Sequence, residues 1–299
     1  MNTPQVAHRC GFAALVGRPN VGKSTLLNAL AGQKISIVTP RPQTTRHRVL
    51  GLVNVPGAQI AFVDTPGLHH QQGRALNRAM NRTAAAAALD ADVVVLVIEA
   101  MRFGEEDALA LSRARESNHP IVAVVNKIDT VKQRDRLLPF IAELARRHDF
   151  ADIVPVSARD PRDMQLLLRV IARHLPESPP LFPADQVTDR SENFRIAETI
   201  REKLTLELHD ELPYGIAVEV ESRGEDDGQL VVNCVIWVDR EGQKPIVIGA
   251  GGERLKRIGT QARQELNDML GRRLHLELWV KVREDWADSA QALRQLGME

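Results

Sequence analysis

One run of nine residues, Gly17-Arg18-Pro19-Asn20-Val21-Gly22-Lys23-Ser24-Thr25, has side chains and spacing suited to binding phosphate groups. It fits the pattern G-x-x-x-x-G-K-[ST], in which backbone N–H groups at the start of a helix surround the phosphates. The apolar run 12–16 precedes it and the helix-forming run 26–30 follows it, a strand–loop–helix context that a chance glycine-rich turn would lack. We expect Lys23 to reach the terminal phosphates and Ser24 to hold the Mg²⁺ that bridges them.

A second loop, Asp64-Thr65-Pro66-Gly67, carries groups suited to the same ligand. The Asp64 carboxylate could hold Mg²⁺ through water, and the Gly67 N–H could reach a γ-phosphate oxygen. Alone this tetrapeptide is an ordinary turn, but its place downstream of a phosphate loop favours function.

The segment between these loops, residues 39–47, contains threonines that could respond to a γ-phosphate. One of them should complete the coordination of Mg²⁺ when a triphosphate is bound, which would order the segment. We favour Thr45 over Thr44, and spacing alone does not separate the two.

Asn126-Lys127-Ile128-Asp129 indicates the base. Guanine presents an N1–H and an exocyclic amino group on one edge, and the Asp129 carboxylate can accept both hydrogen bonds. Adenine has an acceptor at N1 and no amino group at C2, so it would leave that site unsatisfied, which is how binding sites reject analogues strongly. The sequence therefore predicts a guanine nucleotide.

These loops need a sheet that brings them to one edge. Between residues 12 and 174, apolar runs alternate with amphipathic patterns, which favours an α/β fold with a mostly parallel, doubly wound sheet. The expected strands are Phe12–Gly17, Arg48–Asn54, Gln59–Asp64, Val93–Glu99, Ile121–Asn126 and Ile153–Ser157, and the expected helices cover 24–31, 74–89, 105–117, 134–148 and 163–174. Ligands of such sheets bind beyond the carboxyl ends of the strands, where the loops above and Ser157-Ala158-Arg159 lie.

Composition limits the classes of protein to consider. A chain of 299 residues with 43% hydrophobic residues suggests about two domains with ordinary cores. Cys10 and Cys234 have no metal or redox spacing, which indicates a reducing, cytosolic compartment. Residues 1–9 have no apolar signal core, and no run reaches the ~18 apolar residues needed to span a bilayer, so we expect neither secretion nor an integral membrane segment. The formal net charge is zero, but residues 1–180 carry 23 basic and 16 acidic side chains and residues 181–299 carry 16 and 23, which supports two domains.

The second half is expected to be a smaller α+β domain. Four prolines within residues 176–189 mark a linker, and the predicted division is a nucleotide domain at 1–178, a linker at 179–190 and a second domain at 191–299. The expected elements of the second domain are a helix at 191–211, strands at 215–222 and 229–239, an apolar stretch at 245–248, the turn Gly249-Ala250-Gly251-Gly252, a helix at 253–270 and a strand at 274–282.

Together these motifs resemble the bacterial Era family of GTPases, which join a TrmE-Era-EngA-like G domain to a type II KH domain. The resemblance rests on the phosphate loop, Gln43-Thr44-Thr45-Arg46-His47, Asp-Thr-Pro-Gly-Leu-His, Asn-Lys-Ile-Asp and the late Gly-x-x-Gly, and it covers nearly the whole chain. It implies Mg²⁺ ligation by Ser24 and Thr45. The nucleotide would be bound by Gly17, Arg18, Pro19, Asn20, Val21, Gly22, Lys23, Ser24, Thr25, Asp64, Thr65, Pro66, Gly67, Asn126, Lys127, Asp129, Ser157 and Ala158.

The resemblance also assigns single-stranded RNA to the turn at 249–252, where two helices of a KH domain clamp the RNA backbone. The RNA-binding residues would be Gly249, Ala250, Gly251, Gly252, Arg254, Lys256 and Arg257. The family often carries a lysine in the middle of this turn, so one phosphate contact is expected to be missing here, with the basic side chains after it compensating. The domain is acidic overall, but residues 244–283 hold nine basic and four acidic side chains.

No catalytic residue is assigned by the sequence. Leu68 stands where many signalling GTPases place a water-orienting glutamine, so we expect slow intrinsic hydrolysis. Relatives with an asparagine at the place of Asn20 often use K⁺ near the phosphates, and K⁺ is accordingly a second expected cation.

The resemblance implies a GTP-hydrolysing switch that binds the 3′ region of small-subunit ribosomal RNA and assists maturation of the small ribosomal subunit. Its location would be cytoplasmic, with peripheral contact at the inner face of the cell membrane. One alternative is a guanine-nucleotide-controlled adaptor whose tail binds protein or a membrane surface, but an adaptor has no need for the glycine turn and the basic cluster after it. A P-loop kinase is disfavoured by the guanine-binding sequence at 126–129.

Overall fold

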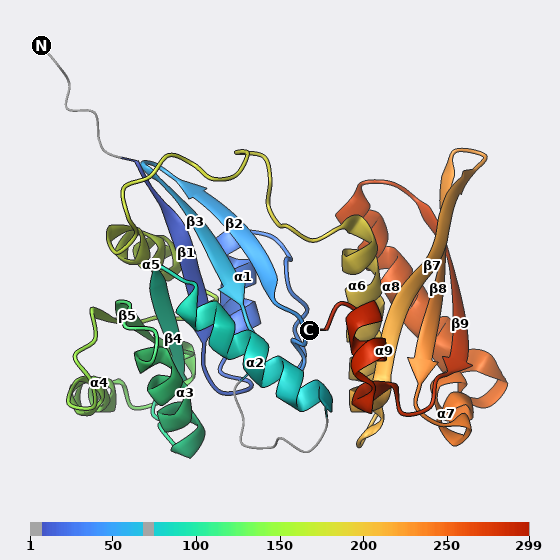
Figure 1. The fold of residues 1–299 in the computed structure, drawn as a ribbon, viewed down its shortest axis with the longest axis horizontal. Helices are drawn as coiled ribbons and strands as arrows, with labels where there is room; N and C mark the ends of the chain where they lie inside the picture. The colour runs from blue at the N-terminus through green and yellow to red at the C-terminus, as the bar shows by residue number, and fades with distance from the viewer. Residues whose placement is uncertain (1–7, 68–74, 299) are drawn as a thin grey trace, which may run out of the picture. The chain divides into compact units, whose positions relative to one another are not determined.

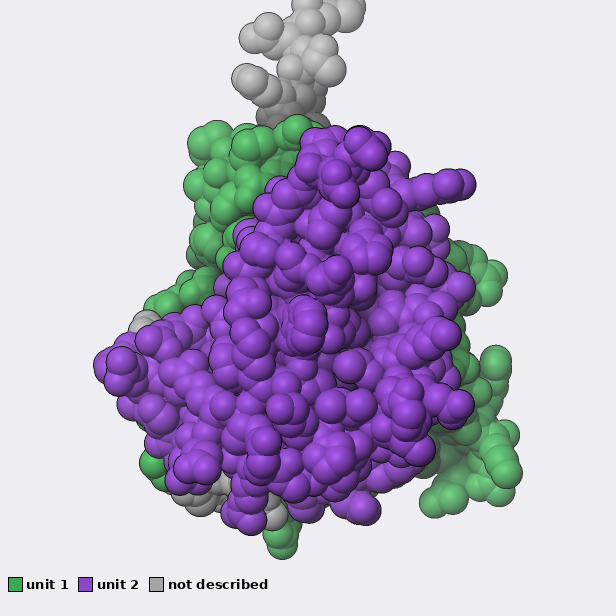
Figure 2. Space-filling view, turned by 90° about the vertical axis from the view of Figure 1, so that its right-hand side faces the viewer, with its two compact units in different colours: residues 1–36, 45–72, 77–189 green, residues 37–44, 73–76, 190–299 purple. Residues whose placement is uncertain are grey.

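The computed structural model describes residues 8–67 and 75–298, which form two compact units. The first unit comprises residues 1–36, 45–72 and 77–189, and the second comprises 37–44, 73–76 and 190–299 (Figure 2). The second unit therefore takes up a short stretch of the chain, 37–44, that lies in sequence between the phosphate loop and Asp64.

Up to residue 189 the chain alternates strands and helices (Figure 1). The strands are β1 (Arg9–Val16), β2 (Val49–Val55), β3 (Ala58–Asp64), β4 (Val93–Glu99), β5 (Ile121–Asn126) and β6 (Asp152–Pro155). The helices are α1 (Lys23–Ala31), α2 (Ala75–Leu89), α3 (Glu105–Arg115), α4 (Leu137–Ala145) and α5 (Pro161–Arg173).

The sheet has the order β2-β3-β1-β4-β5-β6. The β2–β3 pair is antiparallel and the other pairs are parallel, which confirms the mostly parallel sheet predicted from the sequence. Side chains alternate between the two faces of a strand. On β2, Leu50 and Leu52 pack with Ala87 of α2, whereas Gly51 faces Leu27 of α1, so these two helices cover opposite faces. Helices α2, α3 and α4 share one apolar cluster, and α5 contacts α1.

The parallel strands bring the polar loops to one edge of the sheet. Leu15 of β1 is in register with Asp64 of β3, and Glu99 of β4 is in register with Asn126 of β5. The carboxyl ends of these strands therefore lie side by side, as the sequence predicts for a ligand-binding edge.

The proline-rich segment before residue 190 lies against the first unit. Gln59 Oε1 accepts hydrogen bonds from the backbone N–H groups of Leu181 (2.8 Å) and Phe182 (2.9 Å). The N–H of Leu52 donates to Val187 O at 2.9 Å. The segment predicted to serve as a linker is thus fixed along β2 and β3 over most of its length.

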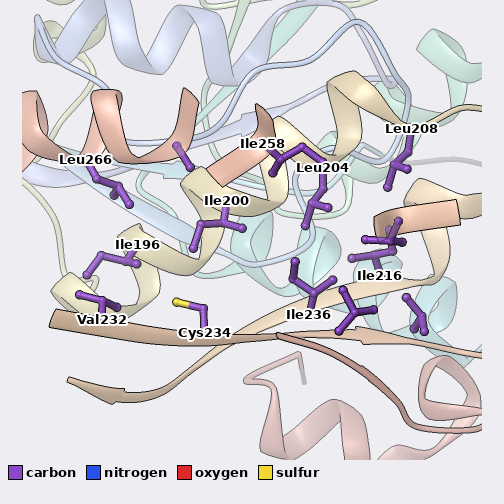
Figure 3. Close-up of a cluster of buried hydrophobic side chains, with 14 of the residues drawn as sticks. Ile196, Ile200, Leu204, Leu208, Ile216, Val232, Cys234, Ile236, Ile258 and Leu266 are labelled. Atoms are coloured by element: carbon purple, nitrogen blue, oxygen red, sulfur yellow. The ribbon is translucent and has the colours of Figure 1, made fainter. Parts of the chain in front are cut away.

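From residue 190 the chain forms a helix-and-sheet domain. Its elements are α6 (Glu192–Glu207), β7 (Ile216–Asp226), β8 (Gln229–Val238), α7 (Lys244–Ile248), α8 (Glu253–Leu270), β9 (Leu274–Val282) and α9 (Ala290–Gln295). Strand β8 lies between an antiparallel β7 and a parallel β9. Ile200 of α6 and Ile258 of α8 pack with Cys234 and Ile236 of β8, so both helices cover one face of this sheet (Figure 3).

Three predicted elements of this domain differ from the structure. Helix α6 ends at Glu207 rather than 211, because Leu208 turns to an extended conformation. Strand β7 continues to Asp226 rather than 222, because its exposed end pairs with β8 as a ribbon and no buried face marks it in the sequence. The apolar stretch at 245–248 is the short helix α7, which begins at Lys244.

The segment 37–44 packs on α6 within the second unit. Arg41 donates from Nε to Thr205 O at 3.0 Å and from Nη2 to Leu208 O, so it satisfies carbonyl groups at the end of that helix. The N–H of Val38 donates to Glu202 Oε1 at 2.9 Å. Within residues 8–67 and 75–298, no helix is long and apolar enough to cross a membrane.

Candidate functional site

The loop from Gly17 to Gly22 joins β1 to α1 as the sequence predicts. Gly22 caps the helix in a left-handed conformation (φ 99°), and a Cβ there would lie 2.6 Å from Asn126 Nδ2, so only glycine fits. Lys23 is buried, and its Nζ donates to Gly17 O (2.9 Å) and Arg18 O (3.1 Å). Burial lowers the pKa of Lys23 to about 8, although the charge of Asp64 acts in the opposite direction.

Hydroxyl and carboxylate oxygens meet beside Lys23. Ser24 Oγ donates to Asp64 Oδ2 at 2.7 Å and lies 2.8 Å from Thr45 Oγ1. Ser36 Oγ also donates to Asp64 Oδ2, at 2.8 Å. Asp64 is fully buried, which raises its pKa, and its Oδ1 has no hydrogen-bond partner among the described residues. This set of hard oxygen donors with one unsatisfied carboxylate oxygen fits Mg²⁺.

The two candidate threonines lie in different surroundings. Thr44 Oγ1 donates to Arg41 O at 2.8 Å and contacts Thr39 Oγ1, both within the segment 37–44. Thr45 instead places its hydroxyl next to Ser24. The geometry supports Thr45, the residue favoured from the sequence, as the Mg²⁺ ligand.

The loop after β3 contacts the phosphate loop. A Cβ on Gly67 would lie 2.8 Å from Pro19 N, so the two backbones approach closely only because residue 67 is glycine. Thr65 is buried, and its Oγ1 donates to Leu15 O at 2.8 Å, which fixes the loop to β1. The prediction for Leu68 lies outside the described residues.

The residues predicted to read guanine gather at the ends of β5 and β6. Asn126 Nδ2 donates to Val21 O at 2.9 Å, which fixes the base-binding loop to the phosphate loop. Asp129 Oδ1 accepts from Ser157 Oγ at 2.8 Å, and its Oδ2 lies 3.5 Å from Arg159 Nη1. The N–H of Ala158 is 3.4 Å from Asn126 Oδ1. The carboxylate of Asp129 is therefore oriented by two neighbours before any base arrives.

A charged cluster beside the phosphate loop joins two predicted nucleotide ligands, Arg18 and Lys127, to two carboxylates that were not predicted as site residues. Arg18, predicted as a nucleotide ligand, directs its guanidinium to Asp107 and Glu99. Burial by itself raises the pKa of Glu99, but the hydrogen bond from Arg18 and the charge of Lys127 outweigh it, so the net pKa lies below the usual range. Glu99 could have been singled out from the sequence, because it is a carboxylate at the carboxyl end of the predicted strand 93–99, where ligands of such sheets bind.

The turn from Gly249 to Gly252 separates α7 from α8 in the second unit. Gly249, Gly251 and Gly252 have φ values of 78°, 58° and 79°, which favour glycine. A Cβ on Gly251 or Gly252 would meet no described atom within 4 Å. The outer side of the turn is therefore open to a ligand backbone.

A groove of about 460 Å³ lies beside this turn, between α8 and β9. Its lining includes the apolar side chains of Leu255, Leu276 and Leu278 and the basic side chains of Lys256 and Arg263. Neither basic side chain forms an ion pair within the part of the chain that the structure describes. Arg263 was not predicted, although its spacing of seven residues from Lys256 puts both on one face of a helix.

The other two predicted basic residues are already engaged. Arg257 donates from Nη2 to Glu207 Oε2 at 2.7 Å, and these hydrogen bonds hold the pKa of Glu207 below its usual range. Arg254 Nη1 donates to Ile246 O, which fixes α7 to α8. The structure therefore offers Lys256 and Arg263, rather than Arg254 and Arg257, as uncommitted cations at the groove.

Two family models match the chain. The 50S ribosome-binding GTPase model matches residues 12–127, and the KH domain model matches residues 211–287. GTPase Era of Stenotrophomonas maltophilia (strain K279a) is 50% identical over 295 residues, which are 99% of this chain and 99% of that protein. GTPase Era of Marinobacter nauticus is 49% identical over 290 residues, which are 97% and 95% of the two chains.

Solved structures of similar proteins agree along nearly the whole chain. One is a variant of Aquifex aeolicus Era bound to GDP.AlF4⁻, and another is Era in complex with MgGDPNP and nucleotides 1506–1542 of 16S ribosomal RNA. Each is 41% identical, has a TM-score of 0.93, and aligns with 97% of this chain and 99% of its own.

Proposed function

This chain belongs to the Era family of GTPases, and from that premise we propose that it is a GTP-hydrolysing switch that binds the 3′ region of small-subunit ribosomal RNA and assists maturation of the small ribosomal subunit. The observation that carries the RNA part is the groove beside the turn at 249–252. An open glycine turn, apolar lining residues and two cations without an ion-pair partner among the described residues suit a single-stranded RNA, since its backbone is charged and its bases are apolar on their faces.

The nucleotide part follows from residues of the first unit. Lys23 and the N–H groups at the start of α1 would bind the phosphates, and Asp129 would accept the two donors of guanine. Ser24 and Thr45 would hold Mg²⁺, with Asp64 placed to accept from its waters. When bound, Mg²⁺ neutralises charge on the β- and γ-phosphates.

Loss or gain of the γ-phosphate would affect the segment 37–44, because Thr45 is covalently linked to it. Thr45 directly follows this segment, and Arg41 within it is bonded to α6. A threonine drawn toward Mg²⁺ would therefore pull on a segment that is packed against the RNA-binding domain.

Two further points of the proposal concern a second cation and the location of the protein in the cell. K⁺ is proposed as a second cation near Asn20, which is exposed in a left-handed conformation (φ 62°) on the phosphate loop. Exchanging NaCl for KCl at constant ionic strength should then raise the turnover of GTP.

We further propose a cytoplasmic location with peripheral contact at the inner face of the cell membrane.

The experiment pairs RNA binding with GTP hydrolysis on one preparation of the full chain. An oligonucleotide with the last ~40 nucleotides of small-subunit ribosomal RNA is titrated with GTP or GDP present, and turnover is measured with and without it. We expect tighter RNA binding with GTP and faster hydrolysis with RNA.

The variant Lys23→Ala is the control for the nucleotide, because its side chain is a phosphate ligand and not part of the apolar core. It should keep basal RNA binding but lose hydrolysis and any response to GTP. RNA binding that is indifferent to sequence and to nucleotide would contradict the proposal and favour the adaptor alternative.

A further inference from the structure

The phosphate loop and the base-binding loop follow strands that are not neighbours. The sheet order places β4 between β1 and β5, so the loop after β1 and the loop after β5 flank the end of β4. GDP must contact both loops at once, and its affinity therefore depends on the distance between them being fixed.

A charged cluster occupies this intermediate position, in which Arg18 and Asp107 are buried and Glu99 and Lys127 are partly exposed. It consists of Arg18 on the phosphate loop, Glu99 at the end of β4, Asp107 on α3 and Lys127 on the base-binding loop. Arg18 Nη2 lies 2.6 Å from Glu99 Oε2, and the same oxygen lies 3.5 Å from Lys127 Nζ. Glu99 thus joins one cation from each loop.

Asp107 holds the opposite side of the guanidinium. Its Oδ2 lies 3.2 Å from Arg18 Nε and accepts from Gly104 N at 2.9 Å, which also caps α3. The side chains of Arg18 and Asp107 are 7% and 1% exposed, so this ion pair is shielded from solvent. An arginine held by one carboxylate on each of two sides is fixed in orientation, because its N–H groups point in fixed directions within one plane.

Arg18 commits its guanidinium to this cluster. The guanidinium of Arg18 faces Glu99 and Asp107, whereas its backbone carbonyl serves Lys23. Two carboxylates balance two cations, so the cluster adds little net charge near the phosphates. Asp107 Oδ1 has no hydrogen-bond partner among the described residues, a cost that an apolar packing would avoid.

We infer that Arg18 and Asp107 are positioning residues for the nucleotide: with Glu99 and Lys127 they hold the phosphate loop and the base-binding loop at the separation that GDP and GTP require. The inference rests on the guanine-nucleotide part of the proposed function and not on RNA binding. It predicts a particular signature. Loosening the cluster should weaken a ligand that spans both loops and spare ligands that occupy only one of them.

The test measures three affinities in the full chain with Mg²⁺ present: fluorescent GDP by titration, and guanosine and pyrophosphate by competition. Arg18→Gln and Asp107→Asn remove one charge each, and the second keeps an acceptor for Gly104 N. Each should lower GDP affinity by about 10-fold or more while guanosine and pyrophosphate change little. Arg18→Lys keeps the charge but not the planar guanidinium that contacts both carboxylates. Its GDP affinity should therefore lie between those of the wild type and Arg18→Gln.

Arg113→Gln is the matched control, because Arg113 forms an exposed ion pair with Glu116 on the same helix α3. It should leave all three affinities unchanged. Equal losses for GDP and pyrophosphate would overturn the inference in favour of a local structural role, and unchanged GDP affinity in Arg18→Gln and Asp107→Asn would overturn it outright. A wild-type chain that binds pyrophosphate and not GDP would refute the proposed function and any positioning role with it.

Discussion

The turns at 17–22 and 249–252 are both rich in glycine and both lead into a helix, but the structure supports them differently. The first is braced by side chains from other elements: Lys23 bonds to its carbonyls, Asn126 to Val21 O and Lys127 to Asn20 O. The second is closed by its own backbone, with Gly252 N donating to Gly249 O at 3.1 Å. A Cβ on Gly251 or Gly252 would meet no described atom within 4 Å.

This difference suits the ligands that we propose for the two turns. A nucleotide is small, so its affinity depends on several groups held at fixed distances before it arrives. An RNA strand is long and charged. Its binding depends more on an accessible surface with nearby cations than on several groups held at fixed distances in advance. Two glycine-rich turns thus suit the two kinds of ligand proposed for them, and the surrounding residues distinguish the two.

The largest effect is expected at the base-binding loop, where Asp129 is proposed to accept the two donors of guanine. Asp129→Asn should lower GTP affinity by at least about 100-fold, because the amide cannot accept both donors of guanine. The amide can donate to the C2 carbonyl of xanthine, so xanthosine triphosphate should bind better to the variant than GTP does. Competition of the two nucleotides for one fluorescent probe measures the exchange.

Ser157→Ala tests whether the hydrogen bond from Ser157 to Asp129 contributes to GTP affinity. It removes the hydroxyl that donates to Asp129 Oδ1 and leaves the carboxylate in place. A smaller loss of GTP affinity, with guanine still preferred, is expected. If Asp129→Asn leaves the preference for guanine intact, the assignment of this loop to the base is wrong.

The parts of this site that could be predicted from sequence are those that depend on local chemistry. Strands Val93–Glu99 and Ile121–Asn126 have the predicted bounds, because both are unbroken apolar runs buried on two faces. The polar loops after β1, β3 and β5 then meet because parallel strands share an edge.

The parts that could not be predicted depend on contacts between distant residues. Arg18 is 81 residues from Glu99 and 89 from Asp107, and no local pattern joins an arginine in a phosphate loop to a carboxylate on a later helix. The engagement of Arg257 by Glu207 is hidden for the same reason. Arg263, by contrast, could have been found from helical spacing once α8 was recognised.

At the open turn, Gly251→Asp should lower affinity for single-stranded RNA by about 10-fold. The new side chain places a negative charge where we propose that the RNA backbone passes, and its Cβ would meet no described atom within 4 Å. GTP binding should be unchanged. Titration of RNA and of fluorescent GDP on the same preparation measures both.

Gly228→Asp is the matched control for that substitution. Gly228 also has a left-handed conformation (φ 74°) and open space at its Cβ position, but it lies in the turn between β7 and β8. It carries the same backbone strain and charge without facing the groove. Equal loss of RNA affinity in both variants would remove the turn at 249–252 from the binding site.

The smallest effect separates the cations around the groove. Lys256→Gln and Arg263→Gln should each reduce the slope of log affinity against log salt by about 0.7, as expected for one phosphate contact on a single strand. Arg257→Gln should change this slope less, because its charge is already compensated by Glu207 at 2.7 Å. RNA titrations over a range of KCl concentrations give the three slopes. A larger change for Arg257→Gln than for Lys256→Gln would mean that the ion pair with Glu207 opens when RNA binds, so that RNA binding at the turn at 249–252 would depend on a rearrangement of this side chain.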